Sequence, residues 1–318
     1  LAIIQPKTVE AQIESAVALA GNQLQNLRKR LSELRSGRNQ VSLAGLNMSL
    51  FDENVPLPAA MQSMLDASVG GAAGEGGLLD SPWGAFVNGT LSVGEQDDVD
   101  DSLGYDIRSK GITAGVDYRI NRKMIVGVAI GFGGSDSDFN QDSGAQDSSS
   151  LTLTVFGNHF INNKIYADWI VSYTENDFDI KRKMDVLGTT HNISASPDGH
   201  QYSMAVGGGY DYVRGPLQIT GFGRIDYINT IIDSYEETGS FYALALTEQR
   251  DESLATAIGV KSAYVFNTKK AVFIPSLEIE WVHEYNQDAR TIEAAFAQSP
   301  SSGSFSIETE QSLSFIHI

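Results

Sequence analysis

The feature that most constrains this chain is a hydrophobic pattern with a period of two from Pro82 onward. In the segment 112–120, Ile, Ala, Val, Tyr and Ile alternate with Thr, Gly, Asp and Arg, and segments 124–132 and 202–212 alternate in the same way. Successive side chains of a β-strand point to opposite faces, so this pattern predicts a series of strands with one apolar face. The connections also alternate strictly between short turns (121–123, 162–164, 214–216, 267–270) and long stretches (94–106, 133–148, 175–200, 231–249).

The two faces of these strands differ in a way that favours a membrane barrel over a soluble β-sandwich. One face carries aliphatic residues in the middle and aromatic residues toward the ends, whereas the other carries small, polar and isolated charged residues. Aromatic girdles around an apolar band, and turns that are short at one end and long at the other, are typical of outer-membrane barrels. We therefore predict an all-β membrane protein, an antiparallel transmembrane β-barrel, with a soluble all-β protein as the alternative. The side chains expected to face lipid include Val126, Val128, Ile130, Leu153, Trp169, Val206, Ile258 and Leu277.

Composition excludes several other classes. The formal net charge of −18 argues against nucleic-acid binding, which needs clustered Lys and Arg against phosphates. The chain has no cysteine, so disulfides, thiolate catalysis and thiolate metal sites are excluded. Numbering begins at Leu1 with no signal peptide, and we expect a processed or trimmed chain.

An amphipathic helix is expected from about Thr8 to Ser36, ahead of the strands. Its apolar residues recur at steps of three and four, which predicts a stripe down one face. Thr8 suits the N-cap and Gly37 the C-terminal cap. About 29 residues at 1.5 Å each would span roughly 43 Å, enough to cross a bilayer-sized barrel. A coiled coil or a helix on a membrane surface is the alternative interpretation.

Several segments resemble the translocator domain of classical autotransporters, the type V secretion barrel. They are QLQNLRKRLSELRSGRNQVSLAGLNMSL (23–50), WGAFVNGTLSVG (83–94), GITAGVDYRINRKMIVGVAIGFGGSDSDF (111–139), GGGYDYVRG (207–215), ETGS (237–240) and LEIEWVHEYNQDAR (277–290). The resemblance implies a twelve-stranded barrel in the bacterial outer membrane, with a helix in its lumen and a passenger at the cell surface. It also implies contacts with outer-membrane lipid and lipopolysaccharide, with the barrel assembly machinery and with periplasmic chaperones.

This resemblance divides the chain into a luminal plug helix (1–37), a linker (38–81) and a barrel (82–318). Nine strands can be counted to about Asn286 and one more from Ser304 to Ile318, so about ten of the expected twelve are countable. We expect residues to be missing at the C-terminus, with divergence of the last strands as the alternative. The helix is expected to enter from outside the cell and to end on the periplasmic side.

The helix and the inward face of the strands carry opposite charges. The second half of the helix is basic, and the inward face of the strands has an excess of acids. We predict contacts between Arg28, Arg30 or Arg35 and the luminal acids Asp117, Asp168, Asp211 and Glu280. The alternative is that the arginines only complement the C-terminal end of the helix dipole.

Catalytic and metal-binding patterns are weak, and we expect neither an enzyme nor a cofactor. His191 and His200 flank Asp198 in one long connection, where some barrel proteases keep a catalytic dyad. Asp136, Asp138, Asn140 and Asp142 have oxygens at calcium-like spacing, but a solvated acidic loop is the better interpretation. Two functions remain: a translocator and anchor for an N-terminal passenger, or a passenger-free barrel acting as a gated pore or surface scaffold.

Overall fold

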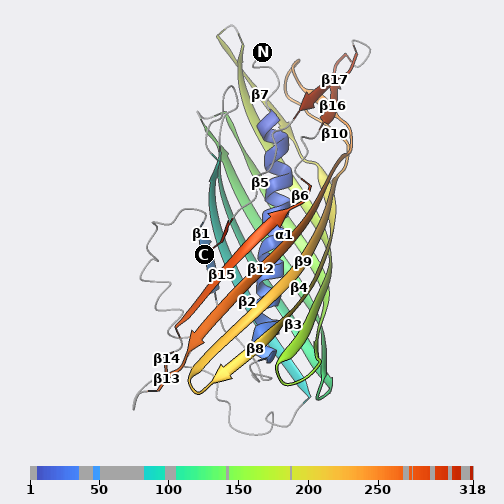
Figure 1. The fold of residues 1–318 in the computed structure, drawn as a ribbon. Coiled ribbons are helices and arrows are strands. Elements are labelled where there is room, and N and C mark those ends of the chain that lie inside the picture. The colour runs from blue at the N-terminus through green and yellow to red at the C-terminus, as the bar shows by residue number, and fades with distance from the viewer. Residues whose placement is uncertain are drawn as a thin grey trace.

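The computed structural model shows a curved sheet wrapped around one long helix (Figure 1). It describes residues 6–35, 46–50, 82–96, 105–140, 143–186, 188–267, 272–273, 275–286, 291–299, 303–308 and 316–317.

The helix α1 spans Pro6–Arg35 and lies inside the curve of the sheet (Figure 1). It begins two residues before the expected N-cap Thr8, with Pro6 in the first turn, where its missing N–H costs nothing. Its 30 residues give a length of about 45 Å at 1.5 Å per residue. The expected cap Gly37 lies outside the described residues. No helix in the described part of the chain is long and apolar enough to cross a membrane.

The main sheet has the order β1-β2-β3-β4-β5-β6-β8-β9-β12-β15-β18, with β7 paired to β6. All its neighbours run antiparallel except β1 and β2, which are parallel. The described strands form a barrel wall with β1 and β18 at its two edges. The strands are β1 (Leu46–Leu50), β2 (Trp83–Gln96), β3 (Tyr105–Asn121), β4 (Met124–Phe139), β5 (Gly144–Phe160), β6 (Ile165–Val186), β7 (Thr189–Ala195), β8 (Asp198–Arg214), β9 (Leu217–Ile232), β12 (Gln249–Tyr264), β15 (Ser276–Glu284) and β18 (Ile316–His317).

The alternation seen in the sequence separates the two faces of this wall. Val128, Leu153 and Val206 point outward and are 53%, 57% and 55% exposed, whereas Thr113 and Asp117 point inward and are buried. Aromatic side chains lie toward both ends of the outward apolar band. Trp83 contacts Tyr118 at one end, with ring centroids 4.8 Å apart, and Tyr173 contacts Tyr202 toward the other, at 5.3 Å. This pattern is that of a lipid-facing barrel surface.

The two ends of the wall are built differently, and we call them the turn end and the loop end. At the turn end, short connections join β3 to β4, β5 to β6 and β8 to β9. Asn side chains stabilise two of these turns: Asn121 Oδ1 accepts the N–H of Lys123 at 2.7 Å, and Asn162 Oδ1 accepts that of Lys164 at 2.8 Å. In the third turn Gly215 adopts a φ of 61°, which glycine tolerates without a steric penalty.

At the loop end, two of the expected long connections proved to be strands. The ranges 133–148 and 175–200 are occupied largely by β4, β5, β6, β7 and β8, which extend past the apolar band as hairpins. Ser135 and Ser137 point inward and are buried, while Asp136 and Asp138 point outward and are exposed. In β4 the alternation therefore continues in polar residues, which hydrophobicity alone does not reveal. In β6 it continues with the buried apolar side chains Phe178, Ile180 and Met184.

A separate small sheet lies at the loop end (Figure 1), in the order β10-β11-β16-β17. Its strands are β10 (Tyr235–Glu236), β11 (Leu244–Leu246), β16 (Thr291–Phe296) and β17 (Phe305–Glu308). The expectation of one strand from Ser304 to Ile318 is therefore wrong, because Phe305–Glu308 pairs with β16 and only Ile316–His317 pairs with β15. Another short pair, β13 (Phe266–Asn267) and β14 (Val272–Phe273), flanks the connection between β12 and β15.

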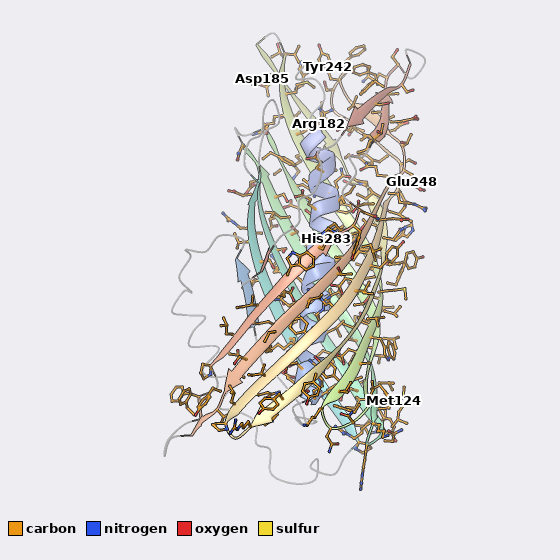
Figure 2. All side chains as sticks on the ribbon, in the orientation of Figure 1. Met124, Arg182, Asp185, Tyr242, Glu248 and His283 are labelled. Carbon is orange, nitrogen blue, oxygen red and sulfur yellow. The ribbon has the colours of Figure 1, made fainter. Side chains whose placement is uncertain are left out.

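A buried ion pair fastens the small sheet to the wall. Arg182 on β6 donates from Nε to Glu237 Oε1 at 2.7 Å, and its guanidinium also contacts the carbonyl of Tyr242 at 3.3 Å. Figure 2 shows Arg182 and Tyr242 together at the loop end, far from Met124 at the turn end. The linker prediction for 38–81 lies outside the described residues except at β1, which pairs with β2.

We predict that the position of the apolar band along β4 can be mapped with arginine. Val128 and Asp136 point outward on the same strand, but only Val128 lies within the apolar band. Val128→Arg should destabilise the protein folded in lipid vesicles by about 2–4 kcal/mol, whereas Asp136→Arg should change its stability by less than about 1 kcal/mol. Urea unfolding in vesicles measures both values, and equal destabilisation would place both residues in the same environment.

Candidate functional site

The candidate site is the contact surface between α1 and the inner face of the wall. Near the turn end, Arg30 is fully buried and donates from Nε to Asp117 Oδ2 on β3 at 2.8 Å, with Nη2 2.7 Å from the same oxygen. Glu33 lies one helical turn further along, 3.5 Å from Arg30 Nη1. A guanidinium and a carboxylate this deeply buried must be paired, because the desolvation of each is costly.

Arg28, at the same end of the helix, reaches a different strand. Arg28 Nη2 lies 2.5 Å from Asp226 Oδ1 on β9. Arg224, on the same strand, contacts Asp226 at 2.9 Å through Nε and Glu280 Oε1 on β15 at 2.6 Å through Nη2. Arg224 thus connects the helix contact on β9 to β15, across the intervening strand β12.

Arg35, the last residue of the helix, reaches β6. Its guanidinium pairs with Asp168, and its centre lies 4.0 Å from the centroid of the Tyr166 ring. Asn158 on β5 donates to the other oxygen of Asp168. The three helix arginines therefore contact β3, β6 and β9. We call this group the ionic belt: Arg28, Arg30, Arg35, Asp117, Asp168, Arg224, Asp226 and Glu280.

Further toward the loop end, two asparagines of α1 contact hydroxyl groups of the wall. Asn22 donates to Ser109 Oγ at 3.0 Å and accepts from Ser92 Oγ at 2.6 Å. Asn26 donates to Thr113 Oγ1 at 3.0 Å and accepts from Thr90 Oγ1 at 2.6 Å. Each amide thus bridges β2 and β3 and uses both its donor and its acceptor in the lumen.

Near the N-terminal end of the helix, amide side chains again make the contacts. Gln12 Nε2 donates to the hydroxyl of Tyr235 in the small sheet at 2.7 Å. Gln146 Nε2 on β5 lies 3.1 Å from Ser15 Oγ, and Gln201 Nε2 on β8 lies 3.4 Å from the carbonyl of Ala16. Burial raises the pKa of Tyr235 to about 12, so its hydroxyl remains protonated at neutral pH.

Apolar packing fills the space between these polar contacts. Leu27, Leu31 and Leu34 on α1 form one buried cluster with Phe86 and Phe156, among others. Small residues in the wall make room for the helix and these rings. A Cβ on Gly127 would lie 2.3 Å from the Phe156 ring, and one on Gly131 would lie 2.2 Å from Gln23 Oε1. Larger residues at these positions would displace the ring or the helix side chain.

The structure brings together some of the residues named from the sequence and not others. Arg30 faces Asp117 and Arg35 faces Asp168, but Arg28 faces Asp226. Glu280 contacts Arg224, and Asp211 accepts a hydrogen bond from Thr220. The amides Gln12, Asn22 and Asn26 were not singled out, although their recurrence on the buried side of the helix is a usable sequence signal.

His191 and Asp198 of the histidine pattern lie apart, and Asp142 of the acidic pattern lies outside the described residues. His191 pairs with Met184 on β6, whereas Asp198 pairs with Asp177, seven residues along the same strand. At about 3.3 Å per residue this separates them by roughly 23 Å. His191 Nδ1 lies 3.2 Å from Ser240 Oγ, and the His200 ring packs against Tyr202. Among the described residues, no group of three or more His, Asp or Glu side chains could hold a metal ion.

Comparison with known proteins gives one family match over most of the chain. The profile of the family described as "Autotransporter beta-domain" matches residues 85–313. The chain is 26% identical over 230 residues to the esterase EstA of Pseudomonas aeruginosa, which covers 69% of this chain and 34% of the relative. It is 23% identical over 241 residues to outer membrane protein B of Rickettsia prowazekii, covering 72% of this chain and 15% of the relative. The chain thus spans about a third or less of the length of these relatives.

Two solved structures are also similar. The translocator domain of the autotransporter NalP from Neisseria meningitidis has a TM-score of 0.49 at 17% identity, covering 74% of this chain and 90% of that chain. The β domain of the Bordetella autotransporter BrkA has a TM-score of 0.49 at 11% identity, covering 68% and 86%.

We predict that the Arg30–Asp117 pair behaves as a buried ion pair. Asp117→Asn leaves Arg30 without a counter-charge and should destabilise the protein by about 3–5 kcal/mol, while Arg30→Met with Asp117→Leu should recover most of that loss. The control is Asp136→Asn, the same substitution at an exposed residue that points outward. Urea unfolding in vesicles gives the stability of these three variants relative to the parent protein. A loss for Asp117→Asn no larger than for the control would show that the pair is not energetically buried.

Proposed function

The chain belongs to the autotransporter beta-domain family of outer-membrane translocator and anchor barrels, and we propose that α1 plugs the barrel lumen and is joined to a passenger at the cell surface. In this proposal the passenger is joined to the N-terminal side of α1 and reaches the cell surface at the loop end. The barrel then anchors it in the bacterial outer membrane.

The direction of the helix is the observation that carries this proposal. Gln12 contacts the small sheet at the loop end, and Arg35 contacts Asp168 close to the turn between β5 and β6. Short turns lie on the periplasmic side of outer-membrane barrels and longer connections on the outside. The N-terminal end of α1 is therefore assigned to the cell exterior. Its C-terminal end is assigned to the periplasmic side, where β2 begins at Trp83.

The contacts along α1 support its role as a plug. Apolar side chains, amides and ion pairs follow one another along the helix, so the helix and wall are complementary over most of its length. A helix held this way occupies the lumen and obstructs the passage of solutes. The same attachment would hold a passenger on the cell surface without a covalent link to lipid.

We assign any catalysis to parts of the full-length protein outside this domain. One similar protein carries the name esterase, but this chain spans 34% of its length. We propose that this domain supplies transport and anchoring, and that any hydrolytic activity belongs to the passenger. Lipopolysaccharide, the barrel assembly machinery and periplasmic chaperones are further proposed partners, expected for any barrel inserted in this membrane.

Epitope tags test the orientation. A tag joined before Leu1 should bind antibody on intact cells, because the chain before α1 is assigned to the exterior. A tag inserted at Gly74, nine positions before the start of β2 in the sequence, should bind only after the outer membrane is permeabilised. The opposite pattern would reverse the helix direction in the membrane and remove the export proposal, leaving a barrel without a surface passenger.

A further inference from the structure

The turn end carries a group of exposed basic side chains that are not part of the ionic belt. Arg122 and Lys123 lie between β3 and β4, Lys164 lies between β5 and β6, and Arg214 is the last residue of β8. The three turn segments 119–124, 161–166 and 212–217 contain no Asp or Glu, although the whole chain has a net charge of −18. We call Arg122, Lys123, Lys164 and Arg214 the basic rim.

In two of these turns the same hydrogen bond, from a backbone N–H to an Asn side chain, positions the lysine. Asn121 Oδ1 accepts the N–H of Lys123, and Asn162 Oδ1 accepts the N–H groups of Lys164 at 2.8 Å and Ile165 at 2.9 Å. The spacing is Asn-x-Lys in both cases, and the sequence repeats it at 267–269. The backbone of each turn is thus fixed by the Asn, which leaves the Lys side chain exposed at the end of the hairpin.

The basic rim adjoins the aromatic girdle that marks this edge of the apolar band. Lys164 Nζ lies 5.9 Å from the centroid of the Tyr210 ring, and Tyr210 points outward with 45% of its surface exposed. Trp83, which is 58% exposed, packs against Tyr118 at the same end. Outward tyrosines and tryptophans lie at the level of lipid headgroups. The contact with Tyr210 therefore brings at least one ammonium group to that level, on the lipid-facing side.

The loop end has the opposite character on its outward face. Asp136, Asp147 and Asp179 are directly opposite one another on β4, β5 and β6, and all are exposed. Basic residues also occur there, but they are interspersed with acids, and Arg108 lies opposite Asp136. The two edges of the apolar band thus differ in charge as well as in turn length.

From this placement we infer that the basic rim binds the headgroups of anionic phospholipids in the periplasmic leaflet of the outer membrane. Basic residues next to a membrane surface are attracted to anionic lipids. A protein partner is less favoured because the clearest contact, between Lys164 and Tyr210, lies beside the lipid-facing surface rather than on the turn tips alone. The leaflet follows from the orientation given under the proposed function, whereas lipid binding does not depend on it.

Lipid retention in mixed nanodiscs tests this inference. The protein is placed in nanodiscs of phosphatidylcholine and phosphatidylglycerol, and native mass spectrometry gives the ratio of the two lipids that stay bound. The variant R122Q/K123Q/K164Q/R214Q removes the basic rim. The control R108Q/K110Q/K181Q/K183Q removes the same number of charges from the outward face of the loop end, where all four residues are exposed.

The parent protein should retain phosphatidylglycerol in excess of its share of the nanodisc. The basic-rim variant should lose that excess by roughly tenfold, and added salt should weaken it in the parent. The loop-end control should stay close to the parent. Retention in the bulk ratio by the parent, or an equal loss in the control, would overturn the inference. Because nanodiscs have the same lipid on both sides, a reversed orientation would appear only in the epitope-tag experiment.

Discussion

The burial of charged helix residues inside the wall is the constraint on which the rest of the structure depends. Arg30 is fully buried, so its guanidinium has to meet a carboxylate, and Asp117 on β3 supplies it. That pair fixes the rotation and height of the helix relative to one strand. Arg28 and Arg35 then reach β9 and β6, so the helix is held from three directions at its C-terminal end.

The remaining length of the helix is held by weaker but more numerous contacts. Amide and hydroxyl pairs such as Asn22 with Ser109 and Asn26 with Thr113 are neutral, and a single hydrogen bond of this kind contributes about 1 kcal/mol. The helix is thus attached by ion pairs near its C-terminal end and also by amide and hydroxyl groups further along its length.

The sequence predicted the wall more completely than its contents. Alternation placed Val128 outside and Asp117 inside, and steps of three and four placed the helix, because both patterns reflect burial directly. It did not identify Asp226 as the partner of Arg28, because that choice depends on the rotation of the helix within the lumen. The small sheet was also missed, because it depends on pairing between β11 and β16, whose partner residues are 48 to 52 positions apart. The extension of β4 was missed because Ser and Asp alternate there without hydrophobicity, whereas in β6 the alternating Phe178, Ile180 and Met184 were a usable signal.

Single-channel conductance in planar bilayers measures most directly whether α1 occupies the lumen as a plug. The full chain is compared with a variant lacking residues 1–37 and with R28Q/R30Q/R35Q, which keeps the helix but removes its three ionic contacts. The account predicts a low conductance for the full chain, a large and steady conductance for the deletion, and intermittent openings for the triple variant. Equal conductance for the full chain and the deletion would contradict it, because the helix would then not obstruct the lumen.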